Sequence, residues 1–306
     1  MGKAVIFPGQ GTQHAQMGVA WRATPSWEIV EKAEAALGRP LAPLLLEVPD
    51  DALARTLEAQ LTVFLQSLMA WDACRACVEG PVAFAGHSLG QLTALVASGA
   101  LTLEDGITLV ARRAGATQEA ADRRPGRMAA LVGADLEQAE AACAAHDKVW
   151  VANDNAPGQV VIGGTAAGVE AASEKAKELG VRRVIPLNVG GAFHTPLFAE
   201  ARAALEPVLA ETIFAVPVAP VVSNVDGEPH TDPSVWRTQL ADHLVSPVRW
   251  RQSLLTLARQ GADSLIEVGP GNVLAGLARR TLPGVPVRNV AVPADVETVR
   301  TPLEVH

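Results

Sequence analysis

A serine flanked by two glycines, lying between a short apolar run and an amphipathic one, constrains the fold more than any other feature. Gly86-His87-Ser88-Leu89-Gly90 follows residues 82–85, a continuous apolar run typical of a strand covered on both faces. Residues 92–100, which come next, have a helical pattern. Because glycines let a chain turn sharply from strand to helix, the pattern predicts a serine hydroxyl exposed at the carboxyl end of a buried strand.

Short apolar runs and longer amphipathic runs alternate along the chain. This alternation predicts an α/β fold, in which a parallel sheet has helices on both sides. The polar tail after Pro293 is expected to be loosely held. The expected strands are 5–7, 82–85, about 218–222 and 264–268, and the expected helices are 41–46, 63–78, 92–100 and 103–121.

Residues 126–189 have a rhythm of their own. They read as strand, helix, strand, strand, helix, strand, which is the split βαβ motif of ferredoxin-like folds. We therefore expect one larger α/β domain formed by residues 1–125 and 190–306, interrupted by a small inserted subdomain at 126–189. The strands are placed at 128–132, 149–152, 159–162 and 181–189, and the helices at 136–145 and 166–179.

Composition excludes several classes of protein. Of 306 residues, 49% are hydrophobic and 19% are charged, which is typical of a globular chain with a large core. A net charge of −8 argues against general nucleic-acid binding, which needs a surplus of lysine and arginine. No apolar run is long enough to span a membrane or to serve as a signal-peptide core. We expect a cytoplasmic protein. Of its three cysteines, Cys74, Cys77 and Cys143, the first two form a C-x-x-C pair that is expected to consist of buried thiols without a redox or zinc role.

A nucleophilic serine needs a base, and the chain has seven histidines. His194 is the best candidate, because Gly190-Gly191 before it and Pro196 after it place it on a loop. The helix that follows Ser88 would point backbone N–H groups at an oxyanion formed there. Taken alone, these residues still leave open a plain glycine-rich turn and a surface histidine.

Five motifs taken together resemble one family. They have the order and spacing of malonyl-CoA:acyl-carrier-protein transacylases and of polyketide synthase acyltransferase domains, from about residue 4 to residue 280. The resemblance implies an α/β-hydrolase-like large domain with a parallel sheet, plus a small ferredoxin-like inserted subdomain. The motifs are Phe7-Pro8-Gly9-Gln10-Gly11-Thr12-Gln13, Gly86-His87-Ser88-Leu89-Gly90, Arg113, Gly191-Ala192-Phe193-His194 and Glu267-Val268-Gly269-Pro270-Gly271.

The resemblance also implies roles for residues. Ser88 matches the nucleophile and His194 the general base of a serine–histidine pair. Gln10 and Leu89 match the oxyanion-hole positions, which act through backbone N–H groups. The histidine is oriented by a backbone carbonyl near the position of His243, where many relatives have Gln or Asn; we group His243 with the residues around the substrate.

Two further matches concern the substrate. Arg113 matches the arginine that grips the malonyl carboxylate, a role that suits a guanidinium because it binds a carboxylate bidentately. Phe193 occupies a position where a bulky ring accompanies malonyl and a serine accompanies methylmalonyl substrates. Gln91 departs from the Glu of many relatives, and Asn155 matches an insert loop that lies over the cleft.

The implied reaction moves a malonyl group from malonyl-CoA to the phosphopantetheine thiol of an acyl carrier protein, in fatty acid or polyketide biosynthesis. It implies no metal or redox cofactor, and no nucleic-acid or membrane partner. Three alternatives stay open from the residues. They are a carrier-protein thioester hydrolase that edits stalled chains, a specialised loader in a polyketide or malonate decarboxylase system, and a non-catalytic docking module for carrier proteins.

Overall fold

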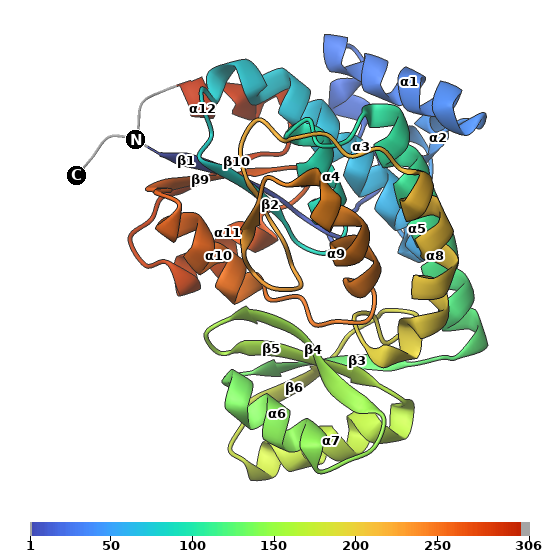
Figure 1. Ribbon diagram of the computed structural model, residues 1–306, viewed down its shortest axis with the longest axis vertical. Helices are drawn as coiled ribbons and strands as arrows, with labels where there is room; N and C mark the ends of the chain where they lie inside the picture. Colours follow the sequence, from blue (N-terminus) through green and yellow to red (C-terminus); the bar gives the residue numbers. More distant parts are fainter. Residues whose placement is uncertain (1, 301–306) are drawn as a thin grey trace.

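The computed structural model describes residues 2–300, which form a larger and a smaller part, each built on its own sheet (Figure 1). The larger part holds a six-stranded sheet in the order β10-β9-β1-β2-β7-β8. Neighbouring strands in this sheet run parallel, except that the edge strand β8 runs antiparallel to β7. The strands are β1 (Lys3–Phe7), β2 (Ala83–Gly86), β7 (Val221–Val222), β8 (Pro229–His230), β9 (Ser264–Val268) and β10 (Val287–Val290).

Alternate residues of β1 and β2 pack on opposite faces of this sheet. Val5, Phe7 and Phe84 join one hydrophobic cluster, and Ile6 and Ala85 join another. The first cluster is covered by α1 (Glu28–Leu37), α2 (Ala42–Leu46), α3 (Thr56–Cys74), α4 (Gly90–Ala97), α5 (Leu103–Arg123), α8 (Ala199–Glu211), α9 (Trp236–Asp242) and α12 (Val296–Arg300). The second is covered by α10 (Trp250–Arg259) and α11 (Val273–Thr281).

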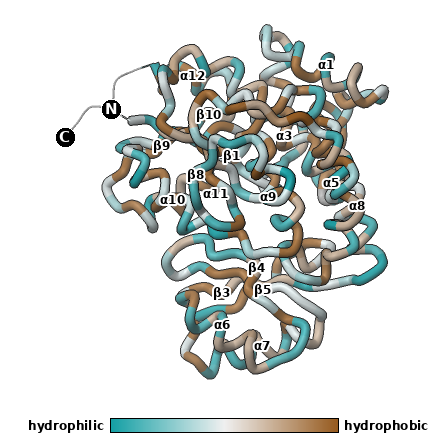
Figure 2. Tube along the Cα trace, viewed as in Figure 1, coloured by the Kyte–Doolittle hydropathy of each residue, from teal (hydrophilic) through white to brown (hydrophobic). Residues whose placement is uncertain are grey.

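Both faces of the large sheet are therefore buried, as the continuous apolar strands predict. Figure 2 shows hydrophobic residues gathered in the interior of the larger part and hydrophilic residues mostly on its outer turns. Within residues 2–300, none of the helices is long and apolar enough to cross a membrane.

The smaller part has the strand order β4-β5-β3-β6, with every neighbouring pair antiparallel. Two helices cover one face of this sheet, and a small apolar cluster that includes Met128 and Val161 lies on the other face. This is the arrangement expected of a ferredoxin-like unit. Its elements are β3 (Arg127–Val132), α6 (Leu136–Ala144), β4 (Val149–Ala156), β5 (Gln159–Gly164), α7 (Ala166–Glu178) and β6 (Arg183–Pro186).

Backbone hydrogen bonds join the two parts. The N–H of Asp154 in β4 donates to the carbonyl of Val248 at 2.9 Å, and the N–H of Val248 donates to the carbonyl of Ala152 at 2.9 Å. An ion pair between Asp154 and Arg251 of α10, also at 2.9 Å, adds to this junction. The edge strand β4 of the smaller sheet is thus held directly against the larger part.

Several expectations differ from the structure. The helix expected at 63–78 is α3, which spans Thr56–Cys74, and Cys77, expected to be buried, is only partly buried. The strands expected at 181–189 and near 218–222 are shorter, as β6 and β7. The expectation of a loose tail after Pro293 was wrong up to residue 300, because η7 (Pro293–Asp295) and α12 are folded there. Val296 and Val299 of α12 pack into the core beside α3. Two separate valines in a polar stretch are too weak a pattern to predict this contact from the sequence. Residues 301–306 of that tail lie outside the described residues.

The turn after β2 depends on its glycines through close approach. A Cβ on Gly86 would lie 1.9 Å from the carbonyl oxygen of Gly90, and a Cβ on Gly90 would lie 2.2 Å from that of Phe7. We therefore expect Gly86→Ala to lower the free energy of unfolding by about 1–3 kcal/mol or more, through overpacking against backbone. Thermal and denaturant unfolding would measure the loss.

Gly115 in α5 is the matched control, since a Cβ there meets no atom within 4 Å. Gly115→Ala should raise the free energy of unfolding by about 0.5–1 kcal/mol, because alanine loses less backbone entropy in a helix. Equal stability of the two alanine variants would contradict the close-approach account.

Candidate active site

Ser88 sits on the sharp turn between β2 and α4, at the carboxyl end of the sheet. Its φ of 52° lies in the left-handed region, which a non-glycine residue adopts only when its surroundings enforce it. The preceding N–H, that of His87, donates to the carbonyl of Phe7 at 3.0 Å, so the turn stays paired to the end of β1. The backbone thus projects the Ser88 hydroxyl away from the sheet.

His194 meets this hydroxyl from a loop 106 positions later. The Nε2 atom of His194 lies 2.8 Å from Ser88 Oγ, and its Nδ1 lies 2.8 Å from the backbone carbonyl of His243. A carbonyl only accepts, so Nδ1 carries the proton and Nε2 is left to accept the serine proton. His194 itself has a φ of 60°, a second strained backbone at the same place.

The environment keeps His194 neutral. Burial, reinforced by the nearby charge of Arg113, lowers the pKa of His194 to about 3. Burial also lowers the pKa of His243, whose ring lies 4.9 Å from that of His194 between centroids. A neutral imidazole whose Nε2 faces a serine hydroxyl is the state that a general base requires.

Arg113 places a buried cation beside the nucleophile. It projects from α5, is only 5% exposed, and donates to Gln60 Oε1 at 2.6 Å and to Ser88 Oγ at 3.2 Å. Burial lowers its pKa to about 10, so it stays charged at neutral pH. Among the described residues no carboxylate pairs with it, which leaves this guanidinium suited to an anionic group of a ligand.

Among the described residues, no hydrogen-bond acceptor is present for the backbone N–H of Gln10, which lines the cavity, or for that of Leu89, which follows Ser88 in the chain. Leu89 is the N-cap of α4, where the helix dipole favours negative charge. The N–H of Ser88 is already used, because it donates to Asn224 Oδ1 at 2.8 Å. The N–H groups of Gln10 and Leu89 are thus free to donate to a ligand oxygen.

These groups open into a cavity of about 550 Å³ between the two parts. The larger part contributes Gln10, Ser88 and Arg113, and the smaller part contributes Met128 and Val161 from the apolar face of its sheet. Phe193 also lines the cavity and packs on Phe198, with ring centroids 5.0 Å apart. The cavity is thus apolar along one wall and polar at the serine.

The carbonyl contact expected at His243 is present, but the grouping of His243 with the residues around the substrate differs from the structure. The residue does not line the cavity; its carbonyl holds His194 and its ring packs behind that of His194. It therefore contacts the base and not the substrate space. Because the contact is made by the backbone carbonyl, it does not depend on the side chain of His243.

Two polar residues at the site carried little or no sequence signal. Asn224, fully buried, bonds the Ser88 turn; it follows a strand directly, which was the one available hint. Asn155 Oδ1 accepts a hydrogen bond from Nε2 of His87 at 2.8 Å. Among the described residues, no group of three or more His, Cys, Asp or Glu side chains is arranged to hold a metal ion.

A strained serine at a strand–helix turn, paired with a neutral histidine and two free N–H donors, defines a serine acyltransferase or hydrolase site. The family model "Acyl transferase domain" matches residues 5–298, and the chain belongs to this family. It is an acyltransferase by this membership.

Relatives extend over almost the whole chain. The malonyl CoA-acyl carrier protein transacylase of Bacillus subtilis (strain 168) is 37% identical, covering 98% of this chain and 96% of that protein. That of Escherichia coli (strain K12) is 38% identical, covering 90% of this chain and 92% of that protein.

Solved structures agree with these relatives. An acyl carrier protein S-malonyltransferase from Vibrio cholerae has a TM-score of 0.93 and 35% identity, covering 98% of this chain and 100% of that one. A malonyl-transacylase in complex with a type II polyketide synthase acyl-carrier protein has a TM-score of 0.93 and 33% identity, covering 98% and 99%.

The low pKa of His194 can be measured directly by NMR titration of its labelled imidazole. We expect His194 to stay neutral from about pH 8 down to about pH 5, where an ordinary histidine would already be protonated. Arg113→Ala should raise this pKa, because it removes a nearby positive charge. Arg112→Ala, which removes an exposed charge from the same helix, should leave it unchanged. Protonation of wild-type His194 near neutral pH would refute the account.

Proposed function

We propose that the protein transfers a malonyl group from malonyl-CoA to the phosphopantetheine thiol of an acyl carrier protein, through a malonyl ester on Ser88. One observation carries the proposal: the unpaired guanidinium of Arg113 lies 3.2 Å from the Oγ that His194 also contacts. A thioester whose acyl group carries a carboxylate would present its carbonyl carbon to Ser88 and its negative charge to Arg113.

The first half-reaction loads the serine. His194 Nε2 takes the proton of Ser88 as Oγ attacks the thioester carbon, and the carbonyl oxygen becomes an oxyanion. The N–H groups of Gln10 and Leu89 stabilise it, and each such donor is typically worth about 3–4 kcal/mol. As the C–S bond breaks, the coenzyme A thiolate takes the proton from His194 and leaves, and the malonyl ester remains on Ser88.

The second half-reaction reverses these steps with another thiol. His194 takes the proton of the carrier-protein thiol, whose sulfur attacks the ester carbon. The oxyanion forms on the same two N–H groups, and collapse returns the proton from His194 to Ser88 Oγ. Because one site serves both thiols in turn, we expect ping-pong kinetics.

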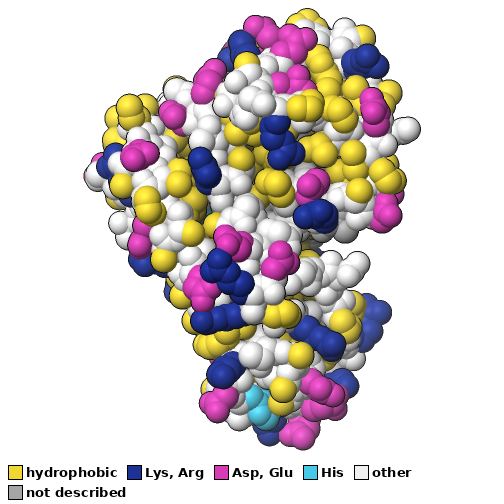
Figure 3. Space-filling model, turned by 90° about the vertical axis from the view of Figure 1, so that its right-hand side faces the viewer, with side chains coloured by type: hydrophobic (Ala, Val, Ile, Leu, Met, Phe, Trp, Pro, Cys, Tyr) yellow, Lys and Arg dark blue, Asp and Glu magenta, His cyan; other side chains and the backbone are white. Residues whose placement is uncertain are grey.

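The reaction as written needs no metal or redox cofactor, since proton transfer and backbone N–H groups supply the chemistry. A cytoplasmic location is part of the proposal, and the free thiols of Cys74, Cys77 and Cys143 support a reducing compartment. Lys and Arg side chains alternate with Asp and Glu over the face in Figure 3, which supports a protein and thioester partner over a nucleic acid.

The alternatives are less favoured. An editing hydrolase for uncharged chains would leave the buried charge of Arg113 unpaired, at a cost in free energy. A docking module without catalysis has no use for a serine and a neutral histidine at 2.8 Å. A polyketide loader uses the same chemistry; a Burkholderia thailandensis polyketide biosynthesis protein is 38% identical to this chain over 92% of its length.

The covalent step can be tested by intact mass after incubation with malonyl-CoA alone. We expect a malonyl-sized gain on the wild-type protein and none on Ser88→Ala or His194→Ala. Arg113→Ala should load malonyl about 10- to 100-fold more slowly, the loss expected for hydrogen bonds to a charged group. Arg112→Ala should load normally, because that side chain is exposed.

Acetyl-CoA completes this experiment. It lacks the carboxylate, so Arg113→Ala should narrow the preference for malonyl-CoA over acetyl-CoA. Free coenzyme A accumulating without a stable ester on the wild-type protein would overturn the transferase in favour of a hydrolase.

Phe193 should set the size of the acyl group. Its ring occupies the cavity beside His194, where an α-methyl group would need space. We expect Phe193→Ala to raise the rate of Ser88 loading by methylmalonyl-CoA relative to malonyl-CoA by about 10-fold or more, the scale of one methyl group in an apolar pocket. Phe214→Ala, at a partly buried ring that does not line the cavity, should leave the ratio unchanged. An unaltered ratio in Phe193→Ala would contradict this role.

A further inference from the structure

Asn224 lies directly beneath the turn that carries Ser88. Its Nδ2 donates to the carbonyl of Gly86 at 2.8 Å, and its Oδ1 accepts from the N–H of Ser88 at 2.8 Å. One amide group therefore bonds the backbone on both sides of His87. The side chain is fully buried, so water does not compete for these two bonds.

The backbone of Asn224 is held as firmly as its side chain. Its N–H donates to Gln91 Oε1 at 2.6 Å, and its carbonyl accepts from the N–H of Arg249 at 2.9 Å. Gln91 lies in the first turn of α4, so this bond ties Asn224 to the helix that follows the nucleophile. Asn224 thus makes two hydrogen bonds through its side-chain amide and two through its backbone, and together they fix the orientation of the amide.

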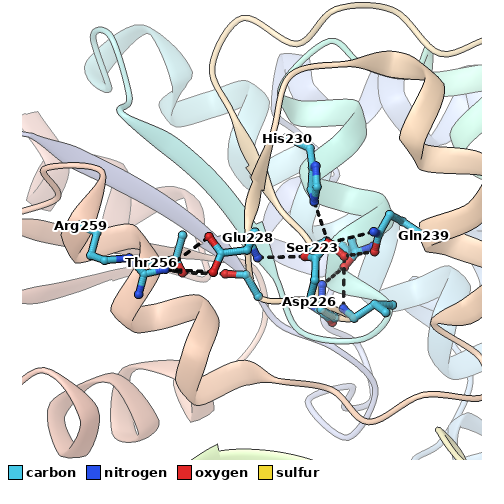
Figure 4. Close-up of polar contacts among 11 residues, drawn as sticks. Ser223, Asp226, Glu228, His230, Gln239, Thr256 and Arg259 are labelled. Atoms are coloured by element: carbon cyan, nitrogen blue, oxygen red, sulfur yellow. Dashed lines mark hydrogen bonds and ion pairs between the residues drawn. The ribbon is translucent and has the colours of Figure 1, made fainter.

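The segment that bears Asn224 is braced from behind (Figure 4). Asp226 accepts from His230 Nε2 and Gln239 Nε2, both at 2.9 Å, and Ser223 Oγ donates to Gln239 Oε1 at 2.6 Å. Gln239 belongs to α9, so these contacts join the turn after β7 to that helix. In Figure 4 the side chains of this group converge around Asp226 and Ser223.

A second set of contacts ties the same turn to α10. Thr256 Oγ1 donates to the carbonyl of Gly227 at 2.6 Å, and Arg259 contacts both Thr256 and Glu228. The turn is thus held between two helices, and Asn224 is presented to the nucleophile from a rigid support. A loosely held asparagine would not impose a backbone conformation on its partner.

The geometry points to Asn224 as a positioning residue for the acyl transfer proposed above. Its amide holds Ser88 in the left-handed backbone conformation, which keeps Oγ in reach of His194 and of the acyl carbon. By occupying the N–H of Ser88, it also leaves the oxyanion to the N–H groups of Gln10 and Leu89. Asn224 touches neither substrate nor the reacting atoms, and acts through the backbone of Ser88.

This role needs an amide, because the two bonds require one donor and one acceptor. In Asn224→Asp the shape is kept, but an ionised carboxylate would place an oxygen against the carbonyl of Gly86, acceptor against acceptor. Only the protonated carboxyl group restores a donor at that point. Burial raises the pKa of a carboxyl group, so this proton should be regained as the pH falls.

The test is the single-turnover rate of Ser88 loading by malonyl-CoA, recorded by mass from about pH 8 to pH 5. We expect Asn224→Asp to load about 10- to 100-fold more slowly than wild type at pH 8, the scale of a buried unpaired polar group. Its rate relative to wild type should rise as the pH falls. Wild type, measured in parallel, accounts for the other charged and titratable groups around the turn: His87, His194, His243, Arg113, Asp226 and His230.

Two controls separate positioning from general damage. Asn272→Asp makes the same chemical change at an exposed site and should load as wild type does. Malonyl-CoA affinity, measured in Ser88→Ala with and without Asn224→Asp, should be the same, because the hydrogen bonds of Asn224 act on the loading step and not on substrate binding. A parallel loss of affinity would overturn the proposal.

A second variant keeps the proposal testable if Asn224→Asp does not fold. Asp226→Asn changes a partly exposed residue that supports the turn bearing Asn224. It should slow loading by a smaller factor than Asn224→Asp does, and the pH profile of loading should stay that of wild type. Loading at the wild-type rate by Asn224→Asp, or a rate that does not recover at low pH, would also overturn the clamp. Absence of an ester on wild type would instead refute the function on which it rests.

Discussion

The left-handed backbone at Ser88 is the constraint on which the rest of the site depends. It brings the first turn of α4 against the end of β1 so closely that positions 86 and 90 have no room for a Cβ. It directs the hydroxyl out of the sheet and frees the N–H of Leu89 at the start of the helix. Such a conformation is disfavoured for serine and persists only because the surrounding hydrogen bonds enforce it.

Electrostatics complete what the backbone begins. The site gathers one permanent cation, Arg113, and three imidazoles, His87, His194 and His243, into a buried space. Burial lowers the pKa of all three imidazoles, and the charges of Arg113 and of the neighbouring histidines lower the pKa of His194 and His243 further. A carbonyl suffices to orient His194, because fixing the tautomer requires only an acceptor. Within residues 2–300 no carboxylate pairs with the guanidinium of Arg113, and this is the basis on which we propose an anionic acyl group.

The cavity lies where the larger and the smaller part of the protein meet. The larger part supplies the chemistry at the carboxyl ends of its parallel strands, and the smaller part turns the apolar face of its antiparallel sheet toward it. The bonds between β4 and Val248 hold the two together where Asn155 reaches His87. A flexible thioester arm can lie along such an apolar wall while its reactive end reaches the polar corner.

The sequence by itself indicated the fold class, the strand–serine–helix turn, the unit at 126–189 and His194 as the candidate partner of Ser88, whereas Arg113 was indicated only by the family resemblance. Glycine at a tight turn and alternating apolar runs encode local geometry, so they can be read locally. The tertiary structure alone decided that the ring of His243 packs behind His194 and outside the cavity, that Asn224 bonds the Ser88 turn, and that residues 293–300 pack on the core. The bond between Asn224 and Gly86 joins residues 138 positions apart, and α12 packs beside α3 from still further along the chain. A buried polar partner is fixed by where helices and strands come to rest, which no local pattern records.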